Sequence, residues 1–419
     1  MRRVVILLGI GLIFGGCSKL SDDRNLVRQD LKVTKAQQEY VDQGNDLGFS
    51  VLGKMDNLEK EEYLFSPLSM QISLGMIVAG AKGNTAKEIV SALGYGEDTR
   101  ATVEYLSSLS SQLKRMDRAT DISIANAFVY NTSSGKTVLP SFKETLSKYN
   151  DSRFFECDFN DKESSAKLIN DWVDTNTDGK INALIDENNP LSGTATAVLL
   201  NALSFKSLWS VPFDKKKTRD DKFYQADDRF VTLPFMHLTG SFNYCEDAMA
   251  QLLTMDYGNG AYRFTVVLPQ ANVVLNDVVN RLKGRSVIEL LSNTSSQKVI
   301  VSIPTFTRRS HVDMVEMLNK CGINDAFSET EADFGNMIDS GKGAVCVSQM
   351  VQRAIFQLDE SGTEAAVVTG TVFDAPTAAP PDEDVSVIFT ANHPFLYMIT
   401  ERSSGAILFL GTFTGNDGQ

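Results

Sequence analysis

Apolar residues recur along this chain at two periods, and each predicts a type of element. Residues 36–55 place Tyr40, Leu47 and Val51 at helical spacing, which predicts a first helix. Residues 197–203 form a continuous apolar run, which predicts a strand buried on both faces. The region between residues 37 and 411 has neither an internal repeat nor a Pro/Ser-rich linker, so we predict one large domain.

The pattern changes character near the C-terminal end. Residues 360–372 are small, neutral or β-branched and alternate at period two, so they suit a buried strand. Residues 374–384 contain three prolines and a cluster of carboxylates, which favour an exposed loop. We therefore predict a loop whose first half can become a strand.

The N-terminus has the pattern of an export signal. Arg2 and Arg3 precede an apolar run over residues 4–14, which is too short to span a bilayer, and Cys17 follows two glycines. This pattern resembles a bacterial lipoprotein signal peptide over residues 1–16, with lipid on Cys17. Residues 17–36 would be a lipidated, flexible tether that anchors the chain to the bacterial cell envelope, at the outer membrane or cell surface. The alternative is a cleaved leader without lipid.

The net charge argues against nucleic acid as a partner, and the cysteine spacing argues against a zinc site or a disulfide framework. The formal charge is −13, and it becomes −15 once the leader with its two arginines is removed. Nucleic acid is therefore not an expected partner. The other four cysteines are widely separated and favour buried free thiols over a zinc site or a dense disulfide framework: Cys157, Cys245, Cys321 and Cys346.

Residues 360–366 read Glu-Ser-Gly-Thr-Glu-Ala-Ala. This segment resembles the hinge of the serpins, serine protease inhibitors whose reactive loop inserts into a β-sheet after cleavage. The resemblance implies an α+β, serpin-like single domain over residues 37–415, with three β-sheets, surrounding helices and an exposed reactive loop at about residues 360–386. The implied hinge residues are Glu360, Gly362, Thr363, Glu364, Ala365 and Ala366.

Other segments match the serpin pattern in the same order along the chain. The matching segments are residues 65–69, 83–85, 122–130, 139–142, 201–209, 235–244, 264–269, 301–306, 322–327, 332–334, 392–399 and 407–411. Their number and order leave little room for coincidence.

The resemblance also implies roles around the sheet that must open. Ser66 and Asn201 would lie in the shutter beneath the central sheet, and Trp209 would lie at the breach, where the loop enters. Gln352 stands where the family usually has a histidine that hydrogen-bonds to the counterpart of Asn201. An amide both donates and accepts, so the network could survive without the pH dependence of a histidine.

Catalysis and metal binding are not predicted. The three histidines, His237, His311 and His393, accompany no hydrolase, metalloprotease or nucleotide-binding motif. Residues 174–179 match the start of a calcium loop, but Ile185 occupies the position of the bidentate glutamate. We expect a chain that is not an enzyme and that has no metal site and no cofactor.

The predicted function is the trapping of a serine protease, which acylates itself on the loop and is distorted when the loop inserts. The protein is expected to be a monomer, with the target protease and, through its lipid, a bilayer as partners. The alternative is a non-inhibitory serpin that acts as an envelope-anchored binding protein. Residues 363–372 favour inhibition because they contain neither proline nor an inward charge.

The reactive bond is harder to place because the loop has extra residues. Counting the family spacing forward from Glu360 puts the residue before the cleaved bond at Pro376, and counting back from residues 387–392 puts it at Pro380. Neither proline is a plausible site of cleavage. We predict cleavage between Thr377 and Ala378, a small-residue pattern that elastase-like proteases accept. Cleavage between Phe373 and Asp374, by a chymotrypsin-like protease, is the alternative.

Overall fold

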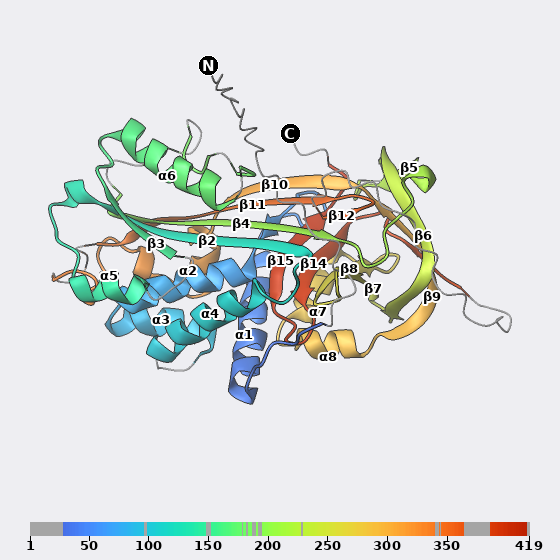
Figure 1. Cartoon of the computed structure of the whole chain (residues 1–419), viewed down its shortest axis with the longest axis horizontal. Coiled ribbons are helices and arrows are strands. Elements are labelled where there is room, and N and C mark those ends of the chain that lie inside the picture. The colour runs from blue at the N-terminus through green and yellow to red at the C-terminus, as the bar shows by residue number, and fades with distance from the viewer. Residues whose placement is uncertain are drawn as a thin grey trace, which may run out of the picture.

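The computed structural model describes residues 28–95, 99–147, 152–177, 179–181, 183–186, 190–191, 195–227, 229–339, 343, 345–363 and 386–416. Helices and strands are mixed along the chain, which confirms the α+β class (Figure 1). The helices are α1 (Lys35–Leu52), α2 (Pro67–Gly80), α3 (Gly83–Leu93), α4 (Thr99–Leu113), α5 (Pro140–Ser147), α6 (Lys162–Asn176), α7 (Leu275–Leu282), α8 (Val287–Ser292) and α9 (Val315–Lys320).

The strands, in chain order, form two hydrogen-bonded sheets. They are β1 (Leu64–Phe65), β2 (Thr120–Asn131), β3 (Ser152–Cys157), β4 (Ala197–Leu208), β5 (Arg219–Tyr224), β6 (Phe230–Glu246), β7 (Ala250–Tyr257), β8 (Tyr262–Pro269), β9 (Ser295–Pro304), β10 (Phe306–Asp313), β11 (Val347–Leu358), β12 (Gly362–Thr363), β13 (Val387–Thr390), β14 (Phe395–Glu401) and β15 (Ile407–Phe413). Short 3₁₀ turns lie at Thr132–Ser134, Lys215–Lys217 and Asp325–Phe327.

The six-stranded sheet has the order β10-β11-β12-β4-β2-β3. Strands β4 and β11 run parallel and pair directly from Ala197 and Val347 to Ser204 and Ile355. The two-residue strand β12 lies between them at one end, where it pairs antiparallel with both. This sheet is therefore closed along most of its centre and already split at one end.

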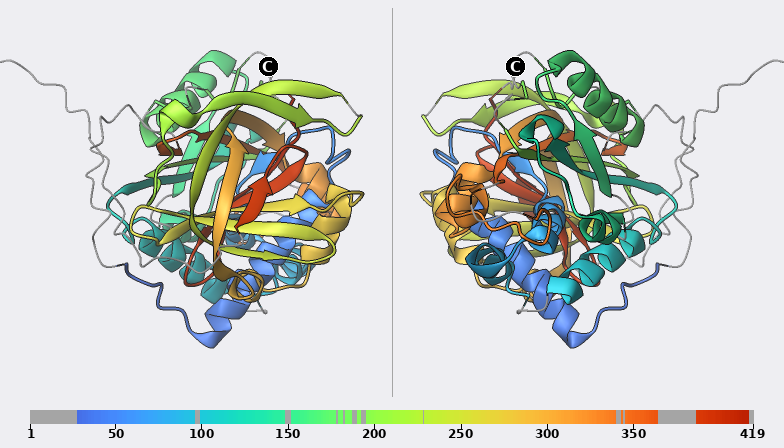
Figure 2. Two further views of the ribbon diagram at one scale, coloured as in Figure 1. Left: turned by 90° about the vertical axis from the view of Figure 1, so that its right-hand side faces the viewer. Right: turned by 90° about the vertical axis from the view of Figure 1, so that its left-hand side faces the viewer.

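The other strands form one nine-stranded sheet, in place of the two further sheets expected. Strand β6 causes the difference because it is 17 residues long. Its first part, residues 230–235, pairs with β5, the following residues up to Tyr244 pair with β9, and its last residues, 243–246, pair with β7. Strand β6 therefore joins strands that would otherwise form separate sheets. Figure 2 (left) shows this sheet at the end of the molecule opposite α3 and α5.

Helices cover both faces of the six-stranded sheet (Figure 1). On one face, α6 packs Ile169 and Val173 against Val198 and Leu200 of β4. On the other face, the main core contains Leu199 and the buried helix α2, in which every residue except Ala79 is buried. Burial on both faces explains the continuous apolar run of β4.

The N-terminal segment packs against the domain from Leu31 onward, before the residue at which the sequence suggested that the domain begins. Leu31 is buried, and its amide donates to Ser403 Oγ at 2.8 Å. Thr34 and Gln37 form a capping box, so α1 begins at Lys35. The prediction of a flexible tether up to residue 36 is wrong for residues 31–36, since burial of Leu31 and the cap fix their positions. In the described part of the chain, no helix combines the length and the apolar character needed to span a membrane.

Candidate functional site

The hinge begins with a tight turn between β11 and β12. The amide of Asp359 donates to the carbonyl of Gly362 at 2.9 Å. The carboxylate of Asp359 accepts from the amides of Ser361 at 2.8 Å and of Gly362 at 3.2 Å. These bonds turn the chain back so that residues 362–363 enter the sheet antiparallel to β11.

Polar contacts outside the turn fix the same segment. The side chain of Glu360 accepts a hydrogen bond from Thr218 Oγ1 at 2.6 Å, and its carbonyl accepts one from the amide of Phe213 at 2.9 Å. The carbonyl of Ser361 accepts from the amide of Trp209 at 2.9 Å. The first residues of the implied hinge are thus held in place in the uncleaved chain.

Thr363 is fully buried between β4 and β11. Its Cα faces Leu358 on one side and Ser207 on the other. Its hydroxyl lies 2.5 Å from the hydroxyl of Tyr257, at the end of β7. Burial raises the pKa of Tyr257 far above its ordinary value, so this phenol stays protonated and available as a donor.

Gly362 has a backbone conformation that other residues rarely adopt, with φ of 155°. A Cβ added here would lie 2.0 Å from the carbonyl oxygen of Ser207 on β4. Glycine is therefore required for this close approach of two backbones. The glycine of the hinge motif has a steric reason in this structure.

Trp209 lies directly after β4 and closes the end of the sheet. Its indole stacks on the ring of Tyr257 at 4.4 Å between centroids, with 8° between the planes. Its Nε1 donates to the carbonyl of Asp359 at 2.9 Å. Trp209 therefore lies beside the described hinge residues, at the end of the sheet where β12 enters, and it also belongs to the core.

Electrostatics oppose the ionised form of Asp359. Burial raises the pKa of this carboxyl, while the two amide hydrogen bonds from Ser361 and Gly362 act in the other direction. The neighbouring Glu360 adds repulsion between like charges. The turn that starts the hinge is therefore sensitive to the protonation of one side chain.

The shutter residues meet in pairs beneath the centre of the sheet. Gln352 Oε1 accepts from the amide of Ser66 at 2.5 Å, and Gln352 Nε2 donates to the carbonyl of Ser66 at 3.2 Å. Gln352 and Asn201 are register partners on β11 and β4. Their side chains do not bond to each other, because Asn201 Nδ2 donates to Asn126 Oδ1 on β2 instead, at 2.5 Å.

Two buried amide atoms of the shutter remain unpaired within the described structure. Asn201 Oδ1 and Asn126 Nδ2 have no hydrogen-bond partner among the described residues. Each such buried polar atom costs about 1–3 kcal/mol. The closed centre of the sheet is therefore less favourable than its apolar packing alone would make it.

Several predicted site residues lie outside the described residues. These are Glu364, Ala365 and Ala366 of the hinge, both candidate reactive bonds (Thr377–Ala378 and Phe373–Asp374), and Cys17. The structure brings together the part of the hinge that it describes, Glu360, Gly362 and Thr363, with Trp209 at the breach. Ser66, Asn201 and Gln352 lie further along the same two strands and under them.

The described residues contain no group of acidic, histidine and cysteine side chains that could hold a metal ion. Ile181 and Ile185 of the calcium-loop look-alike are buried. Burial also lowers the pKa of His237, His311 and His393, which favours their neutral form.

Sequence reasoning missed Tyr257 and Asp359. Asp359 directly precedes the hinge motif, and the side chain of an Asp in a turn often accepts from the backbone amide two residues further on. The sequence therefore contained a signal for the role of Asp359. Tyr257 is 106 residues away from Thr363 in the chain. No period or spacing could connect these two residues.

Comparisons with known proteins agree with this arrangement. Residues 42–415 match the family described as Serpin (serine protease inhibitor). The chain is 34% identical to intracellular coagulation inhibitor 2 of Tachypleus tridentatus over 375 residues, which cover 88% of this chain and 89% of the relative. It is 29% identical to Iripin-8 of Ixodes ricinus, with 88% and 91% covered.

Solved structures show the same architecture. Serpin48 of the insect Tenebrio molitor, described as a highly specific serpin, has a TM-score of 0.78 at 29% identity, with 92% of this chain and 100% of that chain covered. The native state of the thermophilic serpin tengpin has a TM-score of 0.81 at 24% identity, with 95% and 99% covered, and supports the fold. Together with the hinge between β11 and β4, these matches show that the chain belongs to the serpin family.

Proposed function

We propose that this protein inhibits serine proteases as a suicide substrate, with insertion of its cleaved loop into the six-stranded sheet. The observation that carries the proposal is the position of β12. Two parallel strands, β4 and β11, are already separated at one end by two residues that pair antiparallel with both. Continuing this strand between them would replace a parallel pair with two antiparallel pairs, which are slightly more stable per residue.

The sequence after β12 suits this continuation. Residues 365, 367, 369 and 371 share the face of Thr363 at period two, and they are Ala, Val, Thr and Thr. None of them is charged, and residues 364–372 contain no proline. The loop can therefore enter a buried sheet without desolvating a charge on its inward face.

The chemistry belongs to the target protease. Its serine Oγ attacks the carbonyl carbon of the reactive bond, the C–N bond breaks, and the new amine takes the proton. The protease remains esterified to the N-terminal part of the loop. Insertion would then carry the ester along the sheet and distort the protease before water hydrolyses the ester.

Two measurements test the inhibitory mechanism. With an elastase-like protease, we expect a covalent complex that survives a denaturing gel. We also expect the loop-cleaved protein to melt well above the intact protein, because insertion adds a strand to the centre of a sheet. Equal melting temperatures before and after cleavage, without a covalent complex, would support the non-inhibitory alternative.

The target class rests on the loop sequence. Cleavage between Thr377 and Ala378 places proline before the bond and a small residue after it, which elastase-like proteases accept. The mass of the peptide released from the complex identifies the bond. A fragment that begins at Asp374 would replace this assignment with Phe373 and a chymotrypsin-like target.

The N-terminal sequence favours a lipid anchor on Cys17, which would place the inhibitor at the bacterial cell envelope. Metabolic labelling with palmitate in a bacterial host tests this proposal. The full chain should take up label and fractionate with membranes, whereas Cys17→Ala should do neither. Labelling of the Cys17→Ala chain, or an unlabelled full chain, would contradict the anchor.

A further inference from the structure

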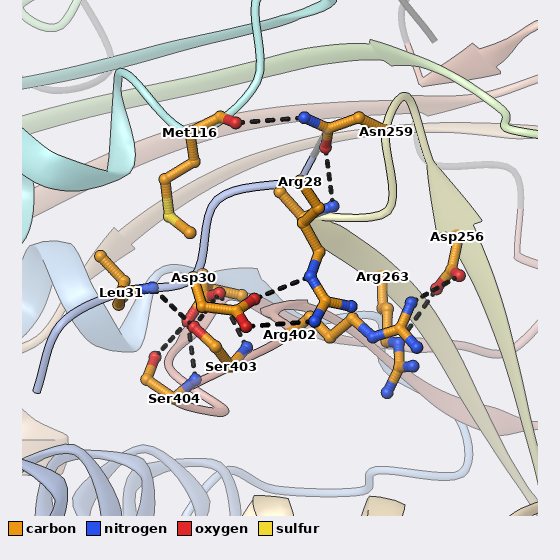
Figure 3. A network of polar contacts seen from close by, with 12 residues as sticks. Arg28, Asp30, Leu31, Met116, Asp256, Asn259, Arg263, Arg402, Ser403 and Ser404 are labelled. Atoms are coloured by element: carbon orange, nitrogen blue, oxygen red, sulfur yellow. Dashed lines mark hydrogen bonds and ion pairs between the residues drawn. The ribbon is translucent and has the colours of Figure 1, made fainter. Parts of the chain in front are cut away.

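A hollow of about 320 Å³ lies between α8, the start of β8 and the turn between β14 and β15. Figure 3 shows the polar contacts around it. Its lining consists of three guanidinium groups, one carboxylate, two serines and two apolar side chains: Arg28, Arg263, Arg402, Asp30, Ser292, Ser403, Ile288 and Leu291. No part of the proposed inhibitory mechanism uses these residues.

The three arginines come from distant parts of the sequence and meet at one point. Arg28 precedes α1, Arg263 is the second residue of β8, and Arg402 follows β14. Burial lowers the pKa of Arg402; Asp256 opposes this shift, and the proximity of Arg263 and Arg28 adds to it. The chain carries a net charge of −13, so this concentration of positive charge runs against its average.

The nearby carboxylates accept hydrogen bonds from only some of the N–H groups of the three arginines. Asp256 is shared, since its Oδ1 accepts from Arg263 Nε and its Oδ2 accepts from Arg402 Nη1, both at 3.0 Å. Within the described part of the chain, Arg28 pairs only with Asp30, at 2.7 and 3.2 Å. Both oxygens of the buried Glu401 accept from the turn that follows it: the amides and hydroxyls of Ser403 and Ser404.

Arg263 is the informative residue of this group. Its side chain is only 9% exposed, yet among the described residues its two terminal nitrogens make no hydrogen bond. A guanidinium carries five N–H donors, four of them on these two nitrogens. These donors are accessible from the hollow and lack a partner among the described residues, although the side chain as a whole is nearly buried, and this arrangement matches a ligand with several acceptor oxygens.

We propose that this hollow binds a phosphate group, held by Arg263 and Arg402 with Arg28 at its edge. Arginine forms bidentate hydrogen bonds with phosphate, whose several oxygens can accept from more than one guanidinium at once. A cluster of guanidinium groups therefore fits a phosphate better than a small monovalent anion. The volume is near the lower limit of small-molecule sites, so the phosphate would belong to a compact molecule or a headgroup. Ile288 and Leu291 offer an apolar surface to the carbon atoms that carry it.

A soluble phosphorylated compound and a lipid headgroup share this chemistry. The lipid source rests on the proposed anchor at Cys17, which is 11 residues before Arg28. An extended chain of that length spans at most about 40 Å. An anchored protein would therefore keep the hollow within reach of a membrane surface.

Isothermal titration of the full mature chain, with Cys17→Ser to omit lipid, tests the site with pyrophosphate and glycerol 3-phosphate as probes. We expect saturable binding at one site, unaffected by chloride at matched ionic strength. Arg402→Gln should weaken binding by about tenfold to a hundredfold, since it removes a charged hydrogen-bond donor. The matched control is Arg229→Gln, which removes the same charge from a guanidinium that is 75% exposed, and its affinity should equal that of the parent.

Arg28→Gln gives a second variant that does not disturb the core, and it should weaken binding severalfold. Melting curves of the variants confirm that they fold. Absence of saturable binding to either probe and to vesicles, or equal losses for Arg402→Gln and Arg229→Gln, would overturn the proposal.

Sedimentation with vesicles of phosphatidylglycerol or of phosphatidylcholine separates the two sources. Binding to anionic vesicles that is lost in Arg402→Gln and displaced by pyrophosphate identifies the lipid headgroup. Binding of pyrophosphate without Arg402-dependent binding to vesicles identifies a soluble ligand. The cleavage and complex assays above do not depend on this hollow, so the inhibitory function and the phosphate site can fail separately.

Discussion

The two ends of the β4–β11 pair differ in how far they are open. At the breach, Thr363 already separates the strands, and its hydroxyl, the turn at Asp359 and the indole of Trp209 all find partners. At the shutter, the strands pair directly through eight register pairs, over two buried amide atoms without partners among the described residues. Under the proposed mechanism, insertion would start at the satisfied end and would be stopped by the closed pairing beyond it.

Under the proposed mechanism, this difference would let the sheet store free energy. The pairing of β4 with β11 would have to break before the loop could replace it, and that requirement would be a kinetic barrier. In the described part of the sheet, β12 separates the two strands beyond Ile355 and Ser204. We expect changes at the breach to alter the start of insertion and changes at the shutter to alter the barrier itself.

Thr363→Arg should have the largest effect. The uncleaved chain can expel two hinge residues, but the inserted loop would have to bury a guanidinium at a fully buried position, at a cost of several kcal/mol. Since about 1.4 kcal/mol slows a step tenfold, deacylation should overtake insertion. The variant should be cleaved as a substrate, with the protease active and no covalent complex on a denaturing gel.

Glu364→Arg is the control, since the period of a strand predicts the opposite face for residue 364. This variant should retain the complex. If Thr363→Arg still forms the complex at undiminished stoichiometry, the insertion mechanism is wrong.

Gln352→Leu should lower the stability of the shutter. It removes both hydrogen bonds to the backbone of Ser66, which is fully buried. The amide of Ser66 is then left without a partner among the described residues, whereas its carbonyl still accepts from the amide of Met70 at 3.0 Å. The expected loss is about 1–3 kcal/mol, from the one unpaired amide. Chemical denaturation of the intact protein measures the loss, and Gln349→Leu, at a half-exposed position of the same strand, should change little. Equal stabilities for the two variants would contradict a structural role for Gln352.

Gly362→Ala should act at the breach alone. The added Cβ would lie 2.0 Å from a backbone oxygen of β4, so β12 must leave the sheet or strain it, at a cost of about 1–3 kcal/mol. Expulsion would also free the carbonyl of Asp359 from Trp209, so indole fluorescence should change. Ser361→Ala is the control, because among the described residues Ser361 forms its hydrogen bonds through its backbone alone. An unchanged spectrum and melting temperature for Gly362→Ala would show that the hinge is not held in the sheet.

Asp359→Asn should give the smallest effect, and it depends on pH. The folded state raises the pKa of Asp359, so this group contributes stability that is present below its ordinary pKa of 3.8 and is lost as pH rises through the folded value. Asparagine keeps an acceptor oxygen for the two amides without the charge. The variant should therefore be slightly more stable than the parent at neutral pH. Thermal melts from pH 3 to 7 measure the difference in melting temperature between the variant and the parent. A difference that grows toward acid pH would contradict a raised pKa of Asp359 in the folded state.

Much of the architecture follows from local sequence. The apolar run at residues 197–203, the Ser-Pro start of α2 and the small residues after Glu360 each favour one local structure, and the serpin resemblance orders them. The hinge glycine and the breach tryptophan also belong to short motifs. Periods and motifs succeed here because propensity and burial act over a few residues.

Tertiary structure decided the contacts between distant segments. The partner of Thr363 is Tyr257, the partner of Gln352 is the backbone of Ser66, and Arg28 meets Arg263 and Arg402 at one hollow. A side chain's period states which face of its own element it occupies, but not which residue lies opposite that face. Those neighbours depend on how the sheets and helices pack, and that packing determines where a threonine is anchored and where donors remain without a partner.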